Sequence, residues 1–226
     1  MIILLPPSEG KSADVGKGSF AQIHPNYTVD LKPVLKHLKS LKGDAVGKFI
    51  GVKDAQKTSA FHKGNVSLLN TGCLPALERY TGVVYRHIEY SSLHAKKRAE
   101  NQIQILSGMF GLISGGTSIP EYKLPLNTWL RNYWLPINTE RLDTLNQKGP
   151  IISLLPKSYA KAVHSDEAIH VDFKLGGGKK LTGHFGKAIK GKFVRFLIDN
   201  DIQSLKDFSE FSEDGFSFDG EHFIQP

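Results

Sequence analysis

The chain alternates short apolar runs with stretches of helical periodicity, and this alternation limits the folds that are open to it. Apolar or alternating runs bounded by turn residues predict five strands. They cover residues 2–5, 83–85, 103–106, 151–155 and 169–173. Because strands separated by helices usually form layered α/β structures, the pattern predicts an α/β fold with a mixed β-sheet and flanking helices.

Helical patterns fill the segments between these runs. Apolar residues at helical spacing predict a helix over 31–41, and shorter patterns predict helices at 75–80 and 157–163. Ser92 and Asn138 are expected to cap the helices AKKRAENQ and TERLDTLN. Side chains of these two types accept hydrogen bonds from the first free amides of a helix.

Two hairpins and one long helix are predicted towards the carboxyl end. The three glycines at 176–178 and the Asp219-Gly220 pair each lie between apolar flanks, which is typical of hairpin turns. The run AIKGKFVRFLIDN has the periodicity of an amphipathic helix. Gly191 inside it costs about 1 kcal/mol relative to alanine, so we expect a neighbour or a ligand to approach closely there.

Composition fits an ordinary globular protein. With 226 residues, 40% of them hydrophobic, the chain can bury a sizeable core, and we expect one domain over residues 1–226. No apolar run approaches the roughly 20 residues that span a bilayer, and the first residues lack a signal-peptide pattern. Cys73 is the only cysteine. These features predict a cytoplasmic protein without a membrane anchor.

Charge is divided unevenly along the last quarter of the chain. A basic segment without acidic residues contains Lys174, Lys179, Lys180, Lys187, Lys190, Lys192 and Arg195. The residues that follow, 199–226, form an acidic tail with Asp199, Asp201, Asp207, Glu210, Glu213, Asp214, Asp219 and Glu221. The basic segment is either a solvated face or a binding surface for a polyanion such as nucleic acid.

The stretch LLPPSEGKS, residues 4–12, ends in Gly-Lys-Ser like a phosphate-binding loop. That loop needs a glycine where Leu5 stands, and it needs backbone amides that Pro6 and Pro7 lack. The glycine-rich residues 13–18 are also a poor start for the required helix. The sequence therefore argues against a nucleotide-binding P-loop here.

Several segments, taken together and in order, resemble the YaaA family of peroxide stress proteins. They span nearly the whole chain, and ILSGMFGLI and GHFGKAIKG are the most specific parts. The matching segments are MIILLPPSEGKS, PALERYTGVVY, QIQILSGMFGLISGGTSIPEYKL, the pair Tyr133-Trp134, IISLLPKSYAKAV, LTGHFGKAIKGKFVRFLI and GFSFDG.

The resemblance implies a cytoplasmic protein that limits oxidative damage during peroxide stress. It also implies an α/β domain with a positively charged cleft, DNA binding, and a helix-hairpin-helix-like element. The family's basic helix corresponds to Lys187, Lys190 and the segment up to Arg195. Lys190 stands where the family commonly has arginine, which replaces a planar bidentate phosphate donor with a point charge.

The run LTGHFGKAIKG carries the ingredients of such an element, because glycine turns present backbone amides to phosphate and lysines flank them. The alternative is a plain strand-to-helix turn. One helix face allows about three or four phosphate contacts, so we expect weak, non-specific and salt-sensitive binding. The predicted nucleic-acid-binding residues are Lys179, Lys180, Gly183, Gly186, Lys187, Lys190, Lys192 and Arg195.

A second hypothesis is an enzyme that acts on a nucleotide or a nucleic-acid-linked substrate. Loops that follow strands in α/β sheets collect ligands, and the predicted cleft is formed by the 7–11 loop, Ser107-Gly108 and His184. Glu9 and His184 would supply acid and base groups, while Lys11 would hold an anion. The candidate cleft residues are Ser8, Glu9, Lys11, Ser107, Gly108, Tyr122 and His184. The sequence assigns no catalytic residue.

Metal and redox chemistry find little support in the sequence. The nine histidines show no His-x-His or His-x-x-x-His spacing on one helix face. We therefore expect no metal and no cofactor. Cys73 is interpreted as a small apolar residue rather than a peroxide-reducing thiol, because a lone cysteine has no resolving partner in the chain. The sequence does not specify an oligomeric state.

Overall fold

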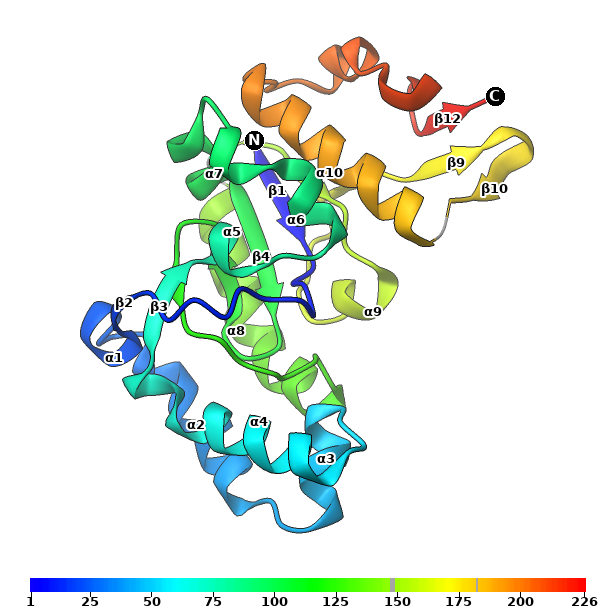
Figure 1. The fold of residues 1–226 in the computed structure, drawn as a ribbon. Coiled ribbons are helices and arrows are strands. Elements are labelled where there is room, and N and C mark those ends of the chain that lie inside the picture. Colours follow the sequence, from blue (N-terminus) through cyan, green and yellow to red (C-terminus); the bar gives the residue numbers. More distant parts are fainter. Residues whose placement is uncertain (147–148, 182) are drawn as a thin grey trace.

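A five-stranded sheet lies at the centre of the molecule, with its strands in the order β5-β4-β1-β7-β8. The computed structural model describes residues 1–146, 149–181 and 183–226, and only the backbone of Lys180. The strands of this central sheet are β1 (Ile2–Leu5), β4 (Ile103–Ser107), β5 (Gly111–Ser114), β7 (Ile151–Ser153) and β8 (Ile169–His170). All are parallel except β5, which runs antiparallel at one edge. Figure 1 shows β1 and β4 side by side in the middle of the molecule.

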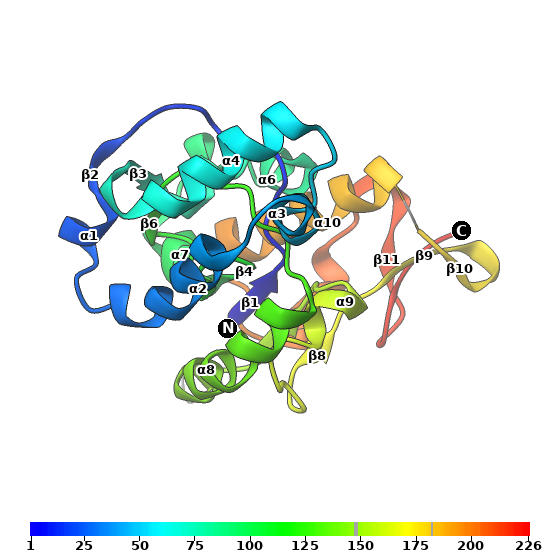
Figure 2. The same ribbon diagram turned by 90° about the horizontal axis from the view of Figure 1, so that it is seen from below.

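The central strands are buried on both faces. Every residue of β1, β4 and β7 is buried, and Ile3 pairs with both Ile103 and Ile152. Strands that are buried along their whole length need cover on both sides. Helix α7 (Lys96–Gln102) packs on β4 and β5, and α8 (Thr128–Asn146) packs on β5. The two helices lie on opposite sides of the sheet (Figures 1 and 2).

Two smaller sheets flank the central one. The three-stranded sheet contains β2 (Lys17–Ser19), β3 (Gly72–Pro75) and β6 (Ser118–Ile119). The four-stranded sheet contains β9 (Phe173–Leu175), β10 (Lys179–Lys180), β11 (Ser217–Phe218) and β12 (Phe223–Gln225). Both predicted hairpins are confirmed, because β9 pairs with β10 across the three glycines and β11 pairs with β12 across Asp219-Gly220.

The helices gather at the two ends of the molecule and around the central sheet. Three of them, α2 (Thr28–Ser40), α3 (Asp44–Ile50) and α4 (Ala55–Ser67), form the lower end in Figure 1. The others are α1 (Phe20–Ile23), α5 (Ala76–Arg79), α6 (Val83–Ile88), α9 (Lys157–Ala160) and α10 (Gly183–Asp199). Short 3₁₀ turns are η1 (Leu68–Asn70), η2 (Tyr90–Ser92), η3 (Gly176–Gly178), η4 (Leu205–Glu210) and η5 (Glu213–Gly215).

Helix α10 lies between α6 and the carboxyl-terminal sheet. Phe193 lies on this helix, and its ring centroid is 5.7 Å from that of Phe173 and 4.8 Å from that of Phe223. On the other side it packs closely on α6, where a Cβ at Gly191 would lie 2.6 Å from Cβ of His87 and too close to the carbonyl oxygen of Val84. The expectation that a neighbour approaches Gly191 is therefore confirmed.

The strands predicted at 2–5 and 103–106 are confirmed, and the one predicted at 151–155 ends at Ser153. The one predicted at 169–173 is divided between β8 and β9, which lie in different sheets, and residues 83–85 are not a strand. They form the first turn of α6 after the cap residue Gly82, and Tyr85 and Ile88 point inward. A three-residue apolar run does not distinguish a strand from a buried helix by its period. The tight packing against α10 favours the helix.

The two predicted caps are also wrong. Asn138 lies inside α8, where its buried side chain accepts from the amide of Leu112 at 2.7 Å and donates to the carbonyl of Ala162 at 2.8 Å. Helix α7 begins at Lys96 with Ala95 at its cap position, while Ser92 ends the turn η2. In both places a tertiary contact outweighs the local capping preference.

The run predicted as a helix-hairpin-helix-like element contains one helix. Lys179 and Lys180 belong to β10, and residues from Gly183 onwards belong to α10, so the described residues of this run, 181 and 183–191, contain no pair of helices. Two helices joined by a short turn do occur at α3 and α4. Gly51 in that turn has a left-handed backbone with φ of 70°.

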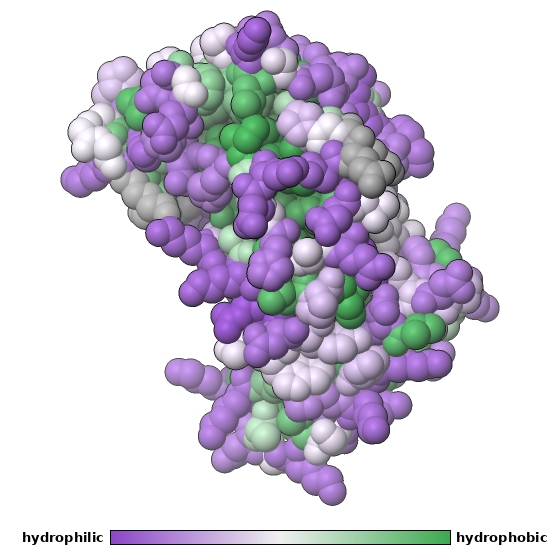
Figure 3. All heavy atoms as spheres, turned by 180° about the vertical axis from the view of Figure 1, so that it is seen from behind, coloured by the Kyte–Doolittle hydropathy of each residue, from purple (hydrophilic) through white to green (hydrophobic). Residues whose placement is uncertain are grey.

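Hydrophilic residues cover most of the surface seen from behind, and apolar residues show only between them (Figure 3). Within the described part of the chain, no helix combines the length and the apolar composition needed to cross a bilayer. The large apolar side chains gather instead in the interior, where one buried cluster runs from β1 to the phenylalanines around α10.

Candidate functional site

A cavity of 390 Å³ lies at the carboxyl ends of β1 and β7. The loop after β1, the residues after β7, the start of α6 and the first half of α10 form its walls. The chain places β4 on one side of β1 and β7 on the other, so the strand order reverses between β1 and β7. In open α/β sheets, ligands bind in the crevice at such a reversal.

The loop after β1 forms one wall and is held in place by its neighbours. The hydroxyl of Tyr85 donates to the carbonyl of Pro6 at 2.7 Å, and the hydroxyl of Ser8 donates to the carbonyl of Gly10 at 2.8 Å. Lys11 forms an isolated β-bridge with Tyr80. No helix follows Gly10-Lys11-Ser12 directly, which agrees with the argument against a P-loop.

Glu9 stands at the cavity and carries a negative charge that is held by lysines. Its carboxylate forms an ion pair with Lys123. That hydrogen bond and the charge of Lys123 lower the pKa of Glu9, and the charges of Lys11 and Lys187 lower it further. The carboxylate therefore faces a positively charged environment that includes α10.

One face of α10 supplies the cationic wall of the cavity. Gly183, Gly186, Lys187 and Lys190 all line it. Lys187 is exposed, whereas Lys190 is half-buried with its ammonium 3.5 Å from the carbonyl oxygen of Leu154. These residues recur at helical spacing, so they share one side of the helix.

The other basic residues of α10 lie on a different face and have acidic partners. Lys192 forms ion pairs with Asp214 at 2.8 Å and Glu213 at 3.5 Å, and the hydrogen bond to Asp214 raises the pKa of Lys192. Arg195 pairs with Glu89 at 3.2 Å and Asp199 at 3.3 Å. The acidic tail thus folds back onto the basic helix.

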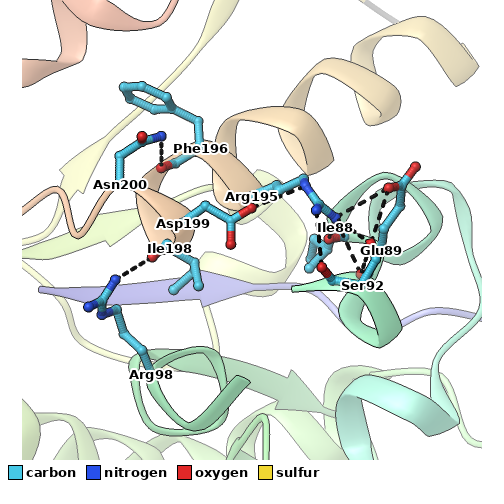
Figure 4. A network of polar contacts seen from close by, with 9 residues as sticks. All are labelled: Ile88, Glu89, Ser92, Arg98, Arg195, Phe196, Ile198, Asp199 and Asn200. Carbon is cyan, nitrogen blue, oxygen red and sulfur yellow. Dashed lines mark hydrogen bonds and ion pairs between the residues drawn. The ribbon is translucent and has the colours of Figure 1, made fainter. Parts of the chain in front are cut away.

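Arg195 also ties α10 to the end of α6. Its guanidinium donates to the carbonyl of Ile88 at 3.1 Å and to the hydroxyl of Ser92 at 3.0 Å, and Figure 4 shows these contacts on one side of the helix. The same view shows Arg98 bonding to the carbonyl of Ile198 at 2.6 Å. Arg195 therefore has a structural role that the sequence did not reveal.

Lys11, Ser107 and Tyr122 form a network beneath the loop instead of lining the cavity. The Tyr122 hydroxyl bonds to Ser107 at 2.8 Å and to Tyr80 at 2.7 Å. The Lys11 ammonium lies 4.3 Å from the Tyr122 ring centroid and donates to the carbonyl of Ser8 at 3.0 Å. Burial lowers the pKa of Lys11 to about 8.

The turn after β4 is closed by its own hydrogen bonds. The Ser107 hydroxyl accepts from the amides of Met109 and Phe110, each at 3.1 Å. Gly108 packs against the backbone of residues 124–126, which leaves no room for a side chain. The amides of Met109 and Phe110 are therefore occupied, and the Ser107 hydroxyl also bonds to Tyr122, whose ring lies beneath the Lys11 ammonium.

The remaining predicted residues lie at the surface. His184 is exposed in the first turn of α10 and is not part of the cavity wall formed by the described residues. Lys179 is exposed on β10, and the side chain of Lys180 lies outside the described structure. Of Glu9, Lys11 and His184, Glu9 lines this cavity and the other two do not.

A family model described as peroxide stress protein YaaA matches residues 1–222. The chain belongs to the YaaA family. It is 31% identical to a UPF0246 protein of Streptomyces coelicolor over 88% of this chain and 83% of the relative. A UPF0246 protein of Corynebacterium glutamicum is 29% identical over 87% and 84%, and one of Francisella tularensis is 23% identical over 96% and 94%.

Four of the segments that resemble the YaaA family meet at the cavity. They contribute the loop after β1, the start of α6, Leu154 with Pro156, and the start of α10. Sequence reasoning missed Tyr85 and Lys123, although both lie in quoted YaaA segments. Residues 83–85 were assigned to a strand, and nothing in the sequence linked Lys123 to Glu9 across more than a hundred residues.

Proposed function

We propose that the chain binds nucleic acid, DNA without sequence preference, across the mouth of this cavity. The observation that carries the proposal is the cationic wall of α10, where Lys187 and Lys190 stand beside two glycines at the start of the helix. Lysine ammonium groups and the amides of a helix start both favour phosphate oxygens. Such contacts position a backbone but do not read its sequence.

The number of contacts is smaller than the basic segment suggests. Lys192 and Arg195 already have carboxylate partners, so phosphate would have to displace an ion pair to reach them. Lys187, which is exposed, and the helix start lie on the cavity side. This charge supports weak, salt-sensitive binding rather than a tight complex.

The pair α3 and α4 is a separate candidate for a helix-hairpin-helix-like contact, distinct from the run at 181–191 where the sequence predicted one. Gly51 turns the chain between these helices, and Lys48 and Lys53 are exposed beside the turn. A glycine turn with flanking lysines is the arrangement that meets phosphate without base contacts. This pair would form a second contact with nucleic acid.

We further propose that binding takes place in the cytoplasm and contributes to tolerance of peroxide. Membership of the YaaA family supports the link to peroxide stress. The buried Cys73 supports a protective role that does not use a thiol, because burial raises its pKa to about 11 and leaves little thiolate.

The proposal is tested by titrating the protein with duplex DNA, single-stranded DNA and RNA at several salt concentrations. The variant K187A/K190A should weaken binding to each form, whereas K17A/K32A should leave it unchanged. Lys17 and Lys32 are exposed and belong to β2 and α2, away from the cavity. Equal binding by both variants would remove α10 from the interface.

An enzyme that acts on a nucleotide or a nucleic-acid-linked substrate is the second candidate. The position of the cavity at the strand reversal favours it, and Glu9 is the acidic side chain in the wall. The test is turnover of nucleotide and oligonucleotide substrates by the wild type and by E9Q. Turnover that E9Q abolishes, while binding persists, would support an enzyme.

A further inference from the structure

The cavity beside α10 has the size and the lining of a small-molecule site. Its volume of 390 Å³ lies within the range of typical ligand pockets, about 300–1,000 Å³. Apolar side chains form one wall, among them Pro6, Val83 and Leu154, and the charged side chains Glu9, Lys187 and Lys190 complete it. This volume suits a single nucleotide rather than a duplex.

We infer that this cavity binds one nucleotide, with the base against the apolar wall and the phosphate on Lys187 and Lys190. The inference rests on the proposed function, because the same lysines serve both. Charge-assisted hydrogen bonds to phosphate are the strong ones in such a site. The apolar side chains would pack against the flat faces of the base. In a duplex these faces are stacked on the neighbouring bases and are not available.

Glu9 fits this arrangement as the partner of the base rather than of the phosphate. Its carboxylate is ionised and held by Lys123, so its charge is compensated. A carboxylate has about four acceptor positions, and the ion pair leaves others for N–H groups. Guanine offers neighbouring ring and amino N–H donors, so the site suits a guanine nucleotide.

One nucleotide can reach the cavity from two sources. It can be a free nucleoside monophosphate, or it can be an unpaired residue at the end of a strand. Guanosine 5′-monophosphate represents the first source, and a duplex with one unpaired 5′-phosphorylated guanine represents the second. Three controls complete the set. A blunt duplex of the same sequence tests whether the guanine must be unpaired, guanosine tests the need for the phosphate, and ribose 5-phosphate tests the need for the base.

The test uses a variant that fills the cavity. Val83 is half-buried at the first residue of α6 and lines the cavity, so V83W occupies the space of the base. Val29 on α2 is 61% exposed and lies away from the cavity, which makes V29W the matched control. K187A is a second variant at an exposed position, in case V83W does not fold.

Calorimetric titration should detect binding of guanosine 5′-monophosphate to the wild type and to V29W. Guanosine and ribose 5-phosphate should each bind about tenfold or more weakly, as expected when one of two anchoring groups is lost. V83W and K187A should bind guanosine 5′-monophosphate more weakly than the wild type by a similar factor. If the unpaired guanine binds better than the blunt duplex, the source is a strand end; if only the mononucleotide binds, the source is the free nucleotide.

The outcomes separate this inference from the proposed function. Blunt-duplex binding that needs Lys187, without any binding of the mononucleotide or the unpaired guanine, would overturn the inference and leave the proposed function intact. Mononucleotide binding that V83W leaves unchanged would also overturn it. Mononucleotide binding that V83W abolishes would support the inference even if no duplex bound.

Discussion

The two faces of α10 make different predictions for the salt dependence of DNA binding. Lys187 faces the cavity, whereas Lys192 is held by Asp214 and Glu213. The variants K187A and K192A each remove one positive charge from the same helix, so the net charge of the protein changes equally. Only a lysine that neutralises a phosphate releases counterions when DNA binds.

The expected magnitude follows from the slope of log K against log salt. Each neutralised phosphate contributes about −0.9 to this slope for duplex DNA. K187A should therefore flatten the slope by about 0.9. Between about 50 mM and 200 mM salt, the affinity of K187A for DNA should then fall by a factor about 3.5 times smaller than the affinity of the wild type. K192A should change the slope by less than about 0.3, because its charge is already paired.

Fluorescence anisotropy with a labelled duplex at four or more salt concentrations measures these slopes. All variants share one fold if their thermal unfolding midpoints agree with the wild type. A slope change for K192A as large as that for K187A would refute the division of α10 into a cavity face and a paired face. An unchanged slope for K187A/K190A would exclude the cavity face as a phosphate contact.

Three further predictions concern Gly191, Cys73 and Lys11. G191A should destabilise the protein by about 1–3 kcal/mol in chemical denaturation, because its methyl group meets the backbone of Val84; greater stability, as helix propensity alone predicts, would contradict the packing of α6 on α10. C73S should leave peroxide survival of cells unchanged, since Cys73 is buried and its pKa is raised to about 11; a clear loss of survival would assign chemistry to the thiol. Burial lowers the pKa of Lys11 to about 8, so between pH 8 and its ordinary value near 10.5 the unfolded chain binds more protons than the folded one. Stability of the wild type relative to K11M should therefore rise with pH across that window and stay level below it, as measured by urea unfolding; a relative stability that falls with pH would refute the burial of the ammonium.

The sequence predicts the central sheet well, because its strands carry a strong local signal. β1 and β7 begin with apolar runs, β4 is a run interrupted by Gln104, and the helices between them indicated an α/β arrangement with a mixed sheet. The strand predicted at residues 83–85 is wrong because three apolar residues have no measurable period. The cap predicted at Asn138 is wrong because the partners of its side chain, Leu112 and Ala162, are distant in sequence.

The candidate site was predicted in part. The loop with Ser8 and Glu9 and the lysines of α10 do meet at one cavity. The sequence could not divide the basic segment into two faces with different partners, because Asp214 reaches Lys192 only through the fold of the acidic tail. Charges that are segregated along the sequence can lie side by side in space. The burial of Ser107 and Tyr122 likewise depends on tertiary packing that no local pattern encodes.

Lysine footprinting tests the central claim most directly. The protein is labelled with an amine-reactive reagent, with and without duplex DNA at low salt, and the modification of each lysine is measured by mass spectrometry. Binding at the cavity face predicts that DNA protects Lys187, while labelling of Lys192 and of the exposed Lys206 on η4 stays the same. Protection of Lys192 without protection of Lys187 would contradict the claim.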